Sequence, residues 1–333
     1  MLELTDVSKR FSKRLDAVEK LARRLGVDVP EHTVHAVDRV SISVAGGEVV
    51  GLVGESGCGK STVGRLACGL IEPSEGQVFY KGQPPAGTRR PQMIFQDPFA
   101  SLNPRMRVED IVGEAPLVHG LIAKNDSRNY VDEILNSVGL DPSYRRRYPH
   151  QFSGGQRARI GIARALAVKP DFLVCDEAVA ALDVSIQAQV LNLFMDLREK
   201  LGLTYLFISH DLGVVRHLAQ RVVVMYLGRV VESAPAAELF AAPNHPYTKA
   251  LLSSIPSMDP DHRTEVPPLA GDPPNPINPP PGCRFHTRCA RAEAVCAQRA
   301  PVLSAGVACL MHEPGSGHSA APLLERAATQ VAA

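Results

Sequence analysis

The stretch Gly54-Glu55-Ser56-Gly57-Cys58-Gly59-Lys60-Ser61 decides the fold of this 333-residue chain. It matches the phosphate-binding pattern G-x-x-x-x-G-K-[ST], in which glycines let backbone amides wrap around an anion at a helix N-terminus. The apolar residues 48–53 before it predict a buried strand, and residues 61–70 after it predict a helix. A chance glycine-rich loop would not need both flanks, so we expect a nucleotide phosphate to bind here.

Two acidic residues farther along the chain complete the pattern of a nucleotide-hydrolysing site. Asp176 and Glu177 directly follow the apolar run 172–175, which predicts that they lie at the end of a buried strand. Asp176 is expected to hold Mg²⁺ together with the Ser61 hydroxyl, while Lys60 binds the β- and γ-phosphates. Glu177 is expected to polarise the attacking water. Cys58, inside the glycine-rich loop, is expected to be a small filler rather than a nucleophile.

The remaining sequence predicts an α/β fold with a helical insert and a tail. Further buried strands are expected at 92–95, 205–209 and 221–226, and the helical patterns between several of them favour a largely parallel sheet. The spacing of apolar residues predicts helices over about 100–165. Residues 15–25, inside an insertion at 12–33, also have a helical pattern. We expect one domain over 1–235. Residues 236–333 are expected to form a separate tail, because ten of the 27 prolines lie within 256–281.

Composition excludes several classes of protein. The formal net charge of +1 carries no field that would attract nucleic acid or an anionic membrane. No run of eighteen apolar residues would span a bilayer, and the N-terminus lacks the apolar core of a secretory signal. Seven cysteines without an export signal favour a reducing cytoplasm, in which thiols stay free or bind metal.

A second anion-binding segment carries a family resemblance. Phe152-Ser-Gly-Gly-Gln156 opens a predicted helix with Ser153 as its N-cap, and its two glycines expose backbone amides. Because the first loop already holds phosphates in cis, this helix start is expected to serve a partner's nucleotide. The segment resembles the signature of ABC ATPases. In the family's order, Gln96 resembles the Q-loop, residues 181–183 the D-loop and His210 the switch histidine.

The resemblance implies a P-loop NTPase core with a helical subdomain, an antiparallel β subdomain and a proline- and cysteine-rich C-terminal tail. It also implies a role for each matching residue. The catalytic residues would be Glu177 and His210, and the ligands of Mg²⁺ would be Ser61, Gln96 and Asp176. Nucleotide in cis would contact Phe11, Gly54, Glu55, Ser56, Gly57, Cys58, Gly59, Lys60, Ser61, Thr62 and Gln96. The partner's nucleotide would contact Arg147, Gln151, Ser153, Gly154, Gly155, Gln156 and Asp183. Phe11 would stack on adenine, with a plain core role as the alternative.

Longer segments narrow the resemblance to the ATPases of dipeptide, oligopeptide and nickel importers. These segments are residues 96–104, 148–156, 245–252 and 282–289. Ala178 and Ala181 depart from the proline and serine that the family usually has there, a change that bears on the rigidity of that loop and removes no ligand.

The resemblance implies partners at the cytoplasmic face of the cell membrane. These are a second ABC ATPase subunit, identical or related, two transmembrane permease subunits and, indirectly, an external solute-binding protein. Peptide is the expected cargo, while nickel and glutathione stay open. A soluble ABC ATPase acting on nucleic acid is a competing reading that the single motif set and near-neutral charge disfavour. The second competing interpretation is a P-loop kinase or GTPase, and residues 153–156 count against it.

Four of the seven cysteines, Cys283, Cys289, Cys296 and Cys309, lie in the tail. Their spacing lacks the paired C-x2-C knuckles of zinc ribbons, and a reducing compartment disfavours disulfides. A proline-rich segment has little apolar surface, so a metal bound by four thiolates would supply its order. Zinc and a 4Fe–4S cluster both accept four thiolates. The family resemblance favours the cluster, and free cysteines packed as small apolar groups are the alternative.

Overall fold

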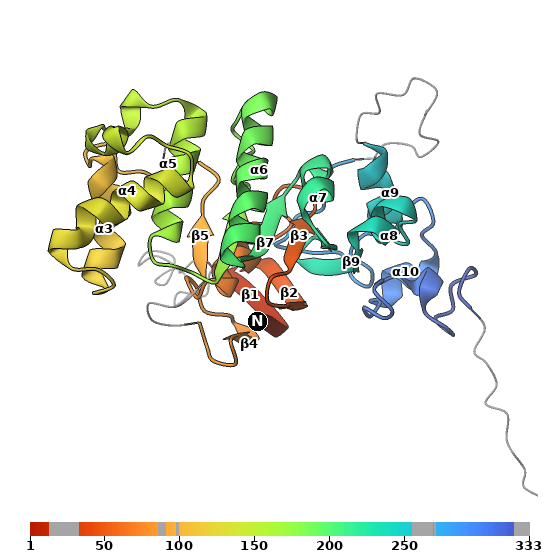
Figure 1. Ribbon diagram of the computed structural model, residues 1–333. Helices are drawn as coiled ribbons and strands as arrows, with labels where there is room; N and C mark the ends of the chain where they lie inside the picture. The colour runs from red at the N-terminus through yellow and green to blue at the C-terminus, as the bar shows by residue number, and fades with distance from the viewer. Residues whose placement is uncertain (13–32, 86–90, 98–99, 255–268, 270, 323–333) are drawn as a thin grey trace, which may run out of the picture.

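The computed structural model describes residues 1–12, 33–85, 91–97, 100–254, 269 and 271–322. The helical pattern expected at 15–25 lies outside the described residues. Figure 1 shows the sheets in the middle, the helices α3 (Val108–Val118), α4 (Ser127–Ser137) and α5 (Gly154–Leu166) on one side, and the tail on the other. The expected helical insert is confirmed by these three helices.

A six-stranded sheet forms the centre of the molecule, in the order β5-β6-β7-β3-β8-β9. The pairs from β5 to β8 are parallel, and β9 joins β8 as an antiparallel edge strand. The strands are β5 (Gln92–Ile94), β6 (Phe172–Asp176), β7 (Thr204–Ser209), β3 (Val49–Val53), β8 (Arg221–Tyr226) and β9 (Arg229–Pro235). Every residue of β3, β6 and β7 is buried, as continuous apolar runs in a covered parallel sheet predict.

A second, antiparallel sheet has the order β2-β1-β4 and comprises β1 (Leu2–Ser12), β2 (Thr33–Val44) and β4 (Glu75–Tyr80). Its apolar face packs on the central sheet, with Leu4 and Ile42 in one buried cluster with Leu52 of β3. Helix α2 (Lys60–Ala67) contributes Val63 and Leu66 to the same cluster. The glycine-rich loop between β3 and α2 is therefore fixed at both ends by buried side chains.

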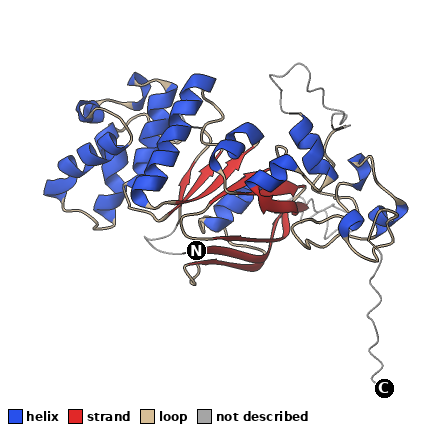
Figure 2. Cartoon of the chain, turned by 45° about the vertical axis from the view of Figure 1, so that its right-hand side comes forward, coloured by secondary structure: helices blue, strands red, loops and turns tan. Residues whose placement is uncertain are grey.

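The other face of the central sheet is covered by helices. Side chains of α3, α4 and α5 share one core with β6 and β7, and α6 (Val184–Leu201) and α7 (Leu212–Leu218) join it. Figure 2 shows the helices stacked beside the strands of the sheet. On α4 and at its C-cap, Val131, Leu135 and Val138 are buried on one face. Gly139 follows with a φ of 71°, the left-handed conformation that ends many helices.

The tail contains α8 (Ala236–Ala241), α9 (Pro246–Ser253) and α10 (Ala294–Gln298), and it packs directly against β8 and β9. The rings of Tyr247 and Phe285 lie 4.7 and 5.2 Å from that of Tyr226 on β8, and all three residues are buried. The expectation that the tail has too little apolar surface to order itself is therefore corrected, because its aromatic side chains share a buried core with β8.

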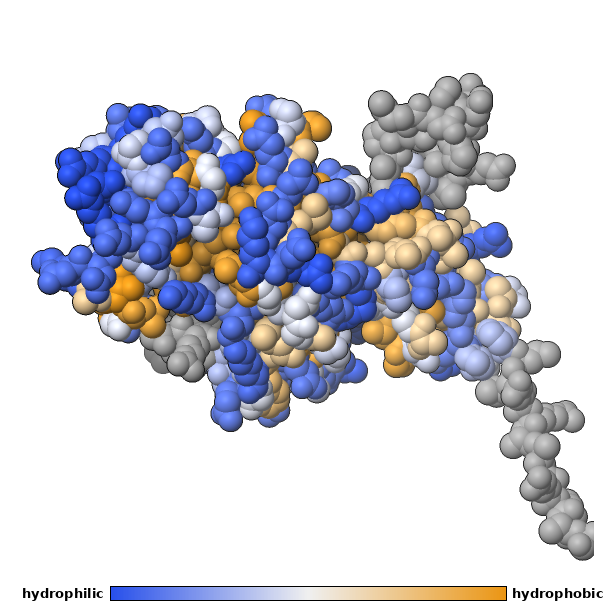
Figure 3. Space-filling model, in the orientation of Figure 1, coloured by the Kyte–Doolittle hydropathy of each residue, from blue (hydrophilic) through white to orange (hydrophobic). Residues whose placement is uncertain are grey.

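The surface carries both polar and apolar side chains. Figure 3 shows hydrophilic residues over most of the helical group on the left and apolar ones between that group and α6. Within the described ranges, no helix is both long enough and apolar enough to cross a membrane.

Candidate nucleotide-binding and hydrolysis site

The glycine-rich loop 54–61 curls at the carboxyl end of β3 and faces an open cleft. Gly59 has a φ of 107°, and a Cβ there would lie 2.2 Å from the carbonyl oxygen of Ala36, so only glycine fits. The cleft has a volume of about 370 Å³. Its lining includes Ser56, Gly57, Gly59, Lys60, Ser61, Thr62, Gln96 and Glu177 from the expected sites. Sequence reasoning missed Val34, Ala36 and Pro276, which also line it.

Lys60 is held inside the loop. Its Nζ donates to the carbonyl oxygens of Gly54 at 2.8 Å and Glu55 at 3.0 Å, and the residue is 4% exposed. The buried ammonium therefore adds positive charge where the loop curls around the cleft, as a phosphate site requires. Burial raises the pKa of the Cys58 thiol, although Lys60 acts against this shift, so the thiol stays protonated. A filler role for Cys58 fits both observations.

The polar side chains meet at the carboxyl ends of neighbouring strands. The loop follows β3, Gln96 follows β5, Asp176 ends β6 and His210 follows β7, in a sheet where these four strands are adjacent. Parallel strands bring their carboxyl ends to one edge of a sheet, which is where ligands bind in such folds. Residues distant in the sequence are thereby gathered around one cleft.

Ser61 and Asp176 form the pair expected at Mg²⁺. The Ser61 hydroxyl donates to Asp176 Oδ1 at 2.9 Å, and both oxygens are hard ligands of the kind that Mg²⁺ prefers. Burial raises the pKa of Asp176, and the hydrogen bond from Ser61 opposes that shift. A divalent cation would favour the ionised carboxylate further. The donor set therefore fits the metal.

Glu177 is the centre of a second polar group. Its Oε2 accepts a hydrogen bond from Gln96 Nε2 at 2.7 Å and lies 3.3 Å from His210 Nδ1. Its backbone has a φ of 49°, and its N–H donates to the carbonyl of Ile208 at 3.0 Å. A non-glycine residue in this left-handed region is strained, and such strain is typical of functional sites. The carboxylate is thus oriented from both sides.

Phe11 does not line the cleft. It pairs with Val34, which does, and it is 43% exposed with the Lys9 ammonium 5.3 Å from its ring centre. An exposed ring beside the cleft is compatible with stacking on a base, and it disfavours the alternative of a core side chain.

The residues expected to serve the partner's nucleotide lie apart from the cleft of their own chain, whose described lining includes none of them. Ser153 caps α5: its Oγ accepts from Gln156 N at 3.3 Å, while Gln156 Oε1 accepts from Ser153 N at 3.1 Å. A Cβ on Gly155 would lie 2.4 Å from Ile186 Cγ2, so a larger residue would push α5 from α6. The Arg147 guanidinium lies 4.0 Å from the Tyr144 ring centre, and Gln151 accepts a hydrogen bond from Tyr148 N. Gly154 begins α5, and Asp183 directly precedes α6.

The four tail cysteines line one small cavity of about 20 Å³, together with His245, His286 and His318, which sequence reasoning missed. Burial, and to a lesser degree the three neighbouring thiols, raise the pKa of Cys283 to about 11. That volume holds roughly one water molecule. Where the described side chains now stand, no group of three or more His, Cys, Asp or Glu could hold a metal ion. The residue types suit four-thiolate ligation, whereas their present spacing does not.

Comparisons with known proteins agree with this geometry. The family model described as ABC transporter matches residues 37–180, and the one described as Oligopeptide/dipeptide transporter, C-terminal region matches 231–296. The oligopeptide transport ATP-binding protein AppF of Bacillus subtilis is 49% identical over 313 residues, covering 90% of this chain and 92% of that protein. The dipeptide transport ATP-binding protein DppF of Escherichia coli is 48% identical, covering 84% and 86%.

Solved structures share the fold. A dimeric ATP-binding cassette bound to ADP and Pi in a post-hydrolysis state aligns with a TM-score of 0.60 at 25% identity, covering 71% of this chain and 99% of that one. A Clostridium perfringens subunit described as part of an ABC transporter complex aligns with a TM-score of 0.59 at 25% identity, covering 72% and 90%.

Proposed function

The chain belongs to the ABC transporter family of ATP-binding subunits, and from this premise we propose that it hydrolyses ATP to drive the import of peptides. The observation that carries the ATPase is the pairing of Ser61 with Asp176 and of Gln96 with Glu177 across one phosphate-binding cleft. The peptide cargo rests on the relatives named for oligopeptide and dipeptide transport and on the match of residues 231–296 to the C-terminal region of such transporters.

In the proposed mechanism, each side chain has a part that its position supports. Lys60 and the amides of the loop bind the phosphates, and Ser61 with Asp176 would hold Mg²⁺, which neutralises charge on the phosphates. Glu177 orients the attacking water and accepts its proton. Gln96 and His210 fix the Glu177 carboxylate through the contacts at 2.7 and 3.3 Å.

We propose that the working unit is a pair of ATPase subunits in head-to-tail contact. The signature residues 153–156 lie away from the cleft of their own chain, which supports a role at the partner's nucleotide. The pair would act at the cytoplasmic face of the membrane with two permease subunits, supplied with solute by an external binding protein. Domain boundaries at 1–235 and 236–333 belong to the same proposal, since β9 ends at Pro235.

Reconstitution tests the cargo. Chains that copurify with this subunit from detergent-solubilised membranes should be permeases, and the complex in lipid vesicles should hydrolyse ATP faster when a peptide-loaded binding protein is added outside. The Glu177→Gln complex, which keeps its architecture, should show no stimulation. If a binding protein loaded with nickel or glutathione stimulates ATP hydrolysis and the peptide-loaded one does not, that solute replaces peptide as the cargo. Copurification with nucleic acid would overturn the transporter assignment.

We also propose that the four tail cysteines bind a 4Fe–4S cluster, with zinc as the alternative. Support comes from the convergence of the four thiols on one cavity. Burial raises the pKa values of Cys283, Cys289 and Cys309, so a bound metal would have to displace their protons. The thiols would have to move outward from a cavity of about 20 Å³. Because aromatic packing already orders the tail, the cluster's role would be to brace it.

Purification under anaerobic conditions is expected to give a brown protein with broad absorption near 400 nm and about four irons per chain. Cys289→Ser should lose the colour and the iron, whereas Cys68→Ser, at a buried cysteine outside the tail, should keep both. Colourless protein with one zinc would replace the cluster by zinc. Protein with neither metal would rule out the site.

A further inference from the structure

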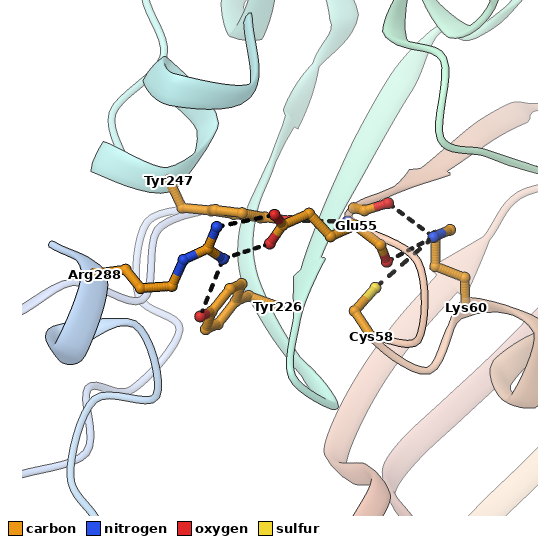
Figure 4. A network of polar contacts seen from close by, with 7 residues as sticks. Glu55, Cys58, Lys60, Tyr226, Tyr247 and Arg288 are labelled. Atoms are coloured by element: carbon orange, nitrogen blue, oxygen red, sulfur yellow. Dashed lines mark hydrogen bonds and ion pairs between the residues drawn. The ribbon is translucent and has the colours of Figure 1, made fainter. Parts of the chain in front are cut away.

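The tail holds the phosphate-binding loop from the side opposite the cleft. Arg288 donates two parallel hydrogen bonds to the Glu55 carboxylate, from Nη1 to Oε2 at 2.7 Å and from Nη2 to Oε1 at 3.1 Å (Figure 4). The Arg288 side chain is 6% exposed and that of Glu55 is 26% exposed. A two-pronged contact between a guanidinium and a carboxylate fixes orientation as well as distance.

The backbone of Glu55 is held as well. Its N–H donates to the Tyr247 hydroxyl at 2.9 Å, and Tyr247 lies on α9 of the tail, fully buried. Arg288 Nη1 also lies 3.4 Å from the hydroxyl of Tyr226 on β8. Figure 4 shows these groups converging on Glu55, with Lys60 on the other side of the loop. Side chain and backbone of one loop residue are thus both bound by tail residues.

Arg288 stands on a rigid base. Arg288 is the last residue of the short helix η4 (His286–Arg288). The residue before this helix, Phe285, packs in the aromatic cluster with Tyr226 and Tyr247. Four residues earlier, Arg284 binds the Asp38 carboxylate and lies 3.3 Å from the carbonyl of Leu227. The tail segment is therefore anchored to the core independently of Glu55, so it can hold the loop rather than be held by it.

The loop needs such a constraint. Gly54, Gly57 and Gly59 all have positive φ values, and glycine gives the backbone no preference of its own for that conformation. Next to Glu55 and Gly57, a second cavity of about 170 Å³ lies between the loop and the tail residues 273–276. Packing alone thus leaves the loop room to shift, and the ion pair opposes that shift.

We propose that Arg288 is a positioning residue for ATP, which acts through Glu55 to keep the loop amides in their phosphate-binding arrangement. Arg288 does not touch the cleft, so its effect falls on affinity rather than on the chemical step. The proposal rests on the proposed function only in that the loop binds ATP. It links the tail, by a direct contact, to the tightness of nucleotide binding.

The test measures the Kd of a fluorescent ATP analogue and the KM and kcat of ATP hydrolysis on the full chain. Arg288→Met should raise Kd and KM about tenfold, the scale of a lost charge-assisted contact, with kcat at saturating ATP nearly unchanged. Arg288→Lys, which keeps the charge but not the two-pronged geometry, should fall between Met and wild type. The matched control is Arg299→Met, which removes the tail ion pair with Glu313, away from the loop, and should leave Kd unchanged.

Unchanged Kd in a folded Arg288→Met protein would mean that the ion pair only docks the tail, and would overturn the proposal. If Arg288→Met does not fold, two other variants decide. Wild-type ATP affinity in Arg288→Lys overturns the proposal. The double variant Glu55→Arg with Arg288→Glu exchanges the two charges, and tighter ATP binding by it than by either single variant supports the proposal. Wild-type protein that binds no ATP would instead overturn the proposed function.

Discussion

Glu177→Gln is expected to lower the rate of ATP hydrolysis by about 10³-fold while ATP affinity stays close to that of the wild type. The substitution preserves the shape of the side chain. In the wild type, Gln96 donates to the Glu177 carboxylate at 2.7 Å, and the amide oxygen of the variant can accept the same hydrogen bond. The amide cannot, however, accept a proton from water. Because the proposed phosphate contacts come from the loop 54–61, binding should persist. Hydrolysis would then no longer reopen the pair, and a dimer closed on ATP should accumulate.

Single-turnover hydrolysis, equilibrium binding of ATP and size-exclusion chromatography measure the three parts of this prediction. Glu199→Gln makes the same chemical change at an exposed position near the end of α6 and should leave all three unchanged. Wild-type rates in a folded Glu177→Gln protein would show that another group positions the water.

The parts of the site that the sequence predicts well are those with local physical causes. The loop 54–61 is contiguous, and its glycines, lysine and serine have fixed spacing. Asp176 and His210 each follow an apolar run that forms a buried strand, so parallel pairing brings them to the same edge. The signature helix begins after Ser153, the residue type that predicts its N-cap.

The contacts that sequence reasoning missed depend on packing between distant segments. Pro276 reaches the cleft because its carbonyl accepts a hydrogen bond from His35 at 3.0 Å, a contact between tail and β2 that no periodicity predicts. The Arg288–Glu55 pair joins residues separated by 233 positions, and although each lies in a segment that carries a motif or a resemblance, neither segment predicts contact with the other. The order within the tail was likewise missed, because it comes from three aromatic rings that meet only in the folded chain.

The second large effect concerns the assignment of residues 153–156 to the partner's nucleotide. Lys60→Ala removes the ammonium that lies within the loop and should weaken nucleotide binding. Ser153→Arg replaces the cap of α5, at a cost of about 1 kcal/mol, and places a bulky cation where the anion should approach. Each variant alone is expected to be nearly inactive, since both sites of its dimer carry one lesion.

Mixing the two inactive variants should restore hydrolysis. In a mixed dimer, the loop of the Ser153→Arg subunit faces the intact signature of the Lys60→Ala subunit, so one composite site is unmodified and the other carries both lesions. Random pairing at equal amounts makes half of the dimers mixed, so activity should return to about one quarter of the wild type if the sites act independently. A mixture of Lys60→Ala with Glu177→Gln is the matched control. Both of its lesions belong to the loop side, every site keeps one, and no activity should return. If neither mixture regains ATP hydrolysis although all variants are folded, the signature helix serves the nucleotide of its own chain.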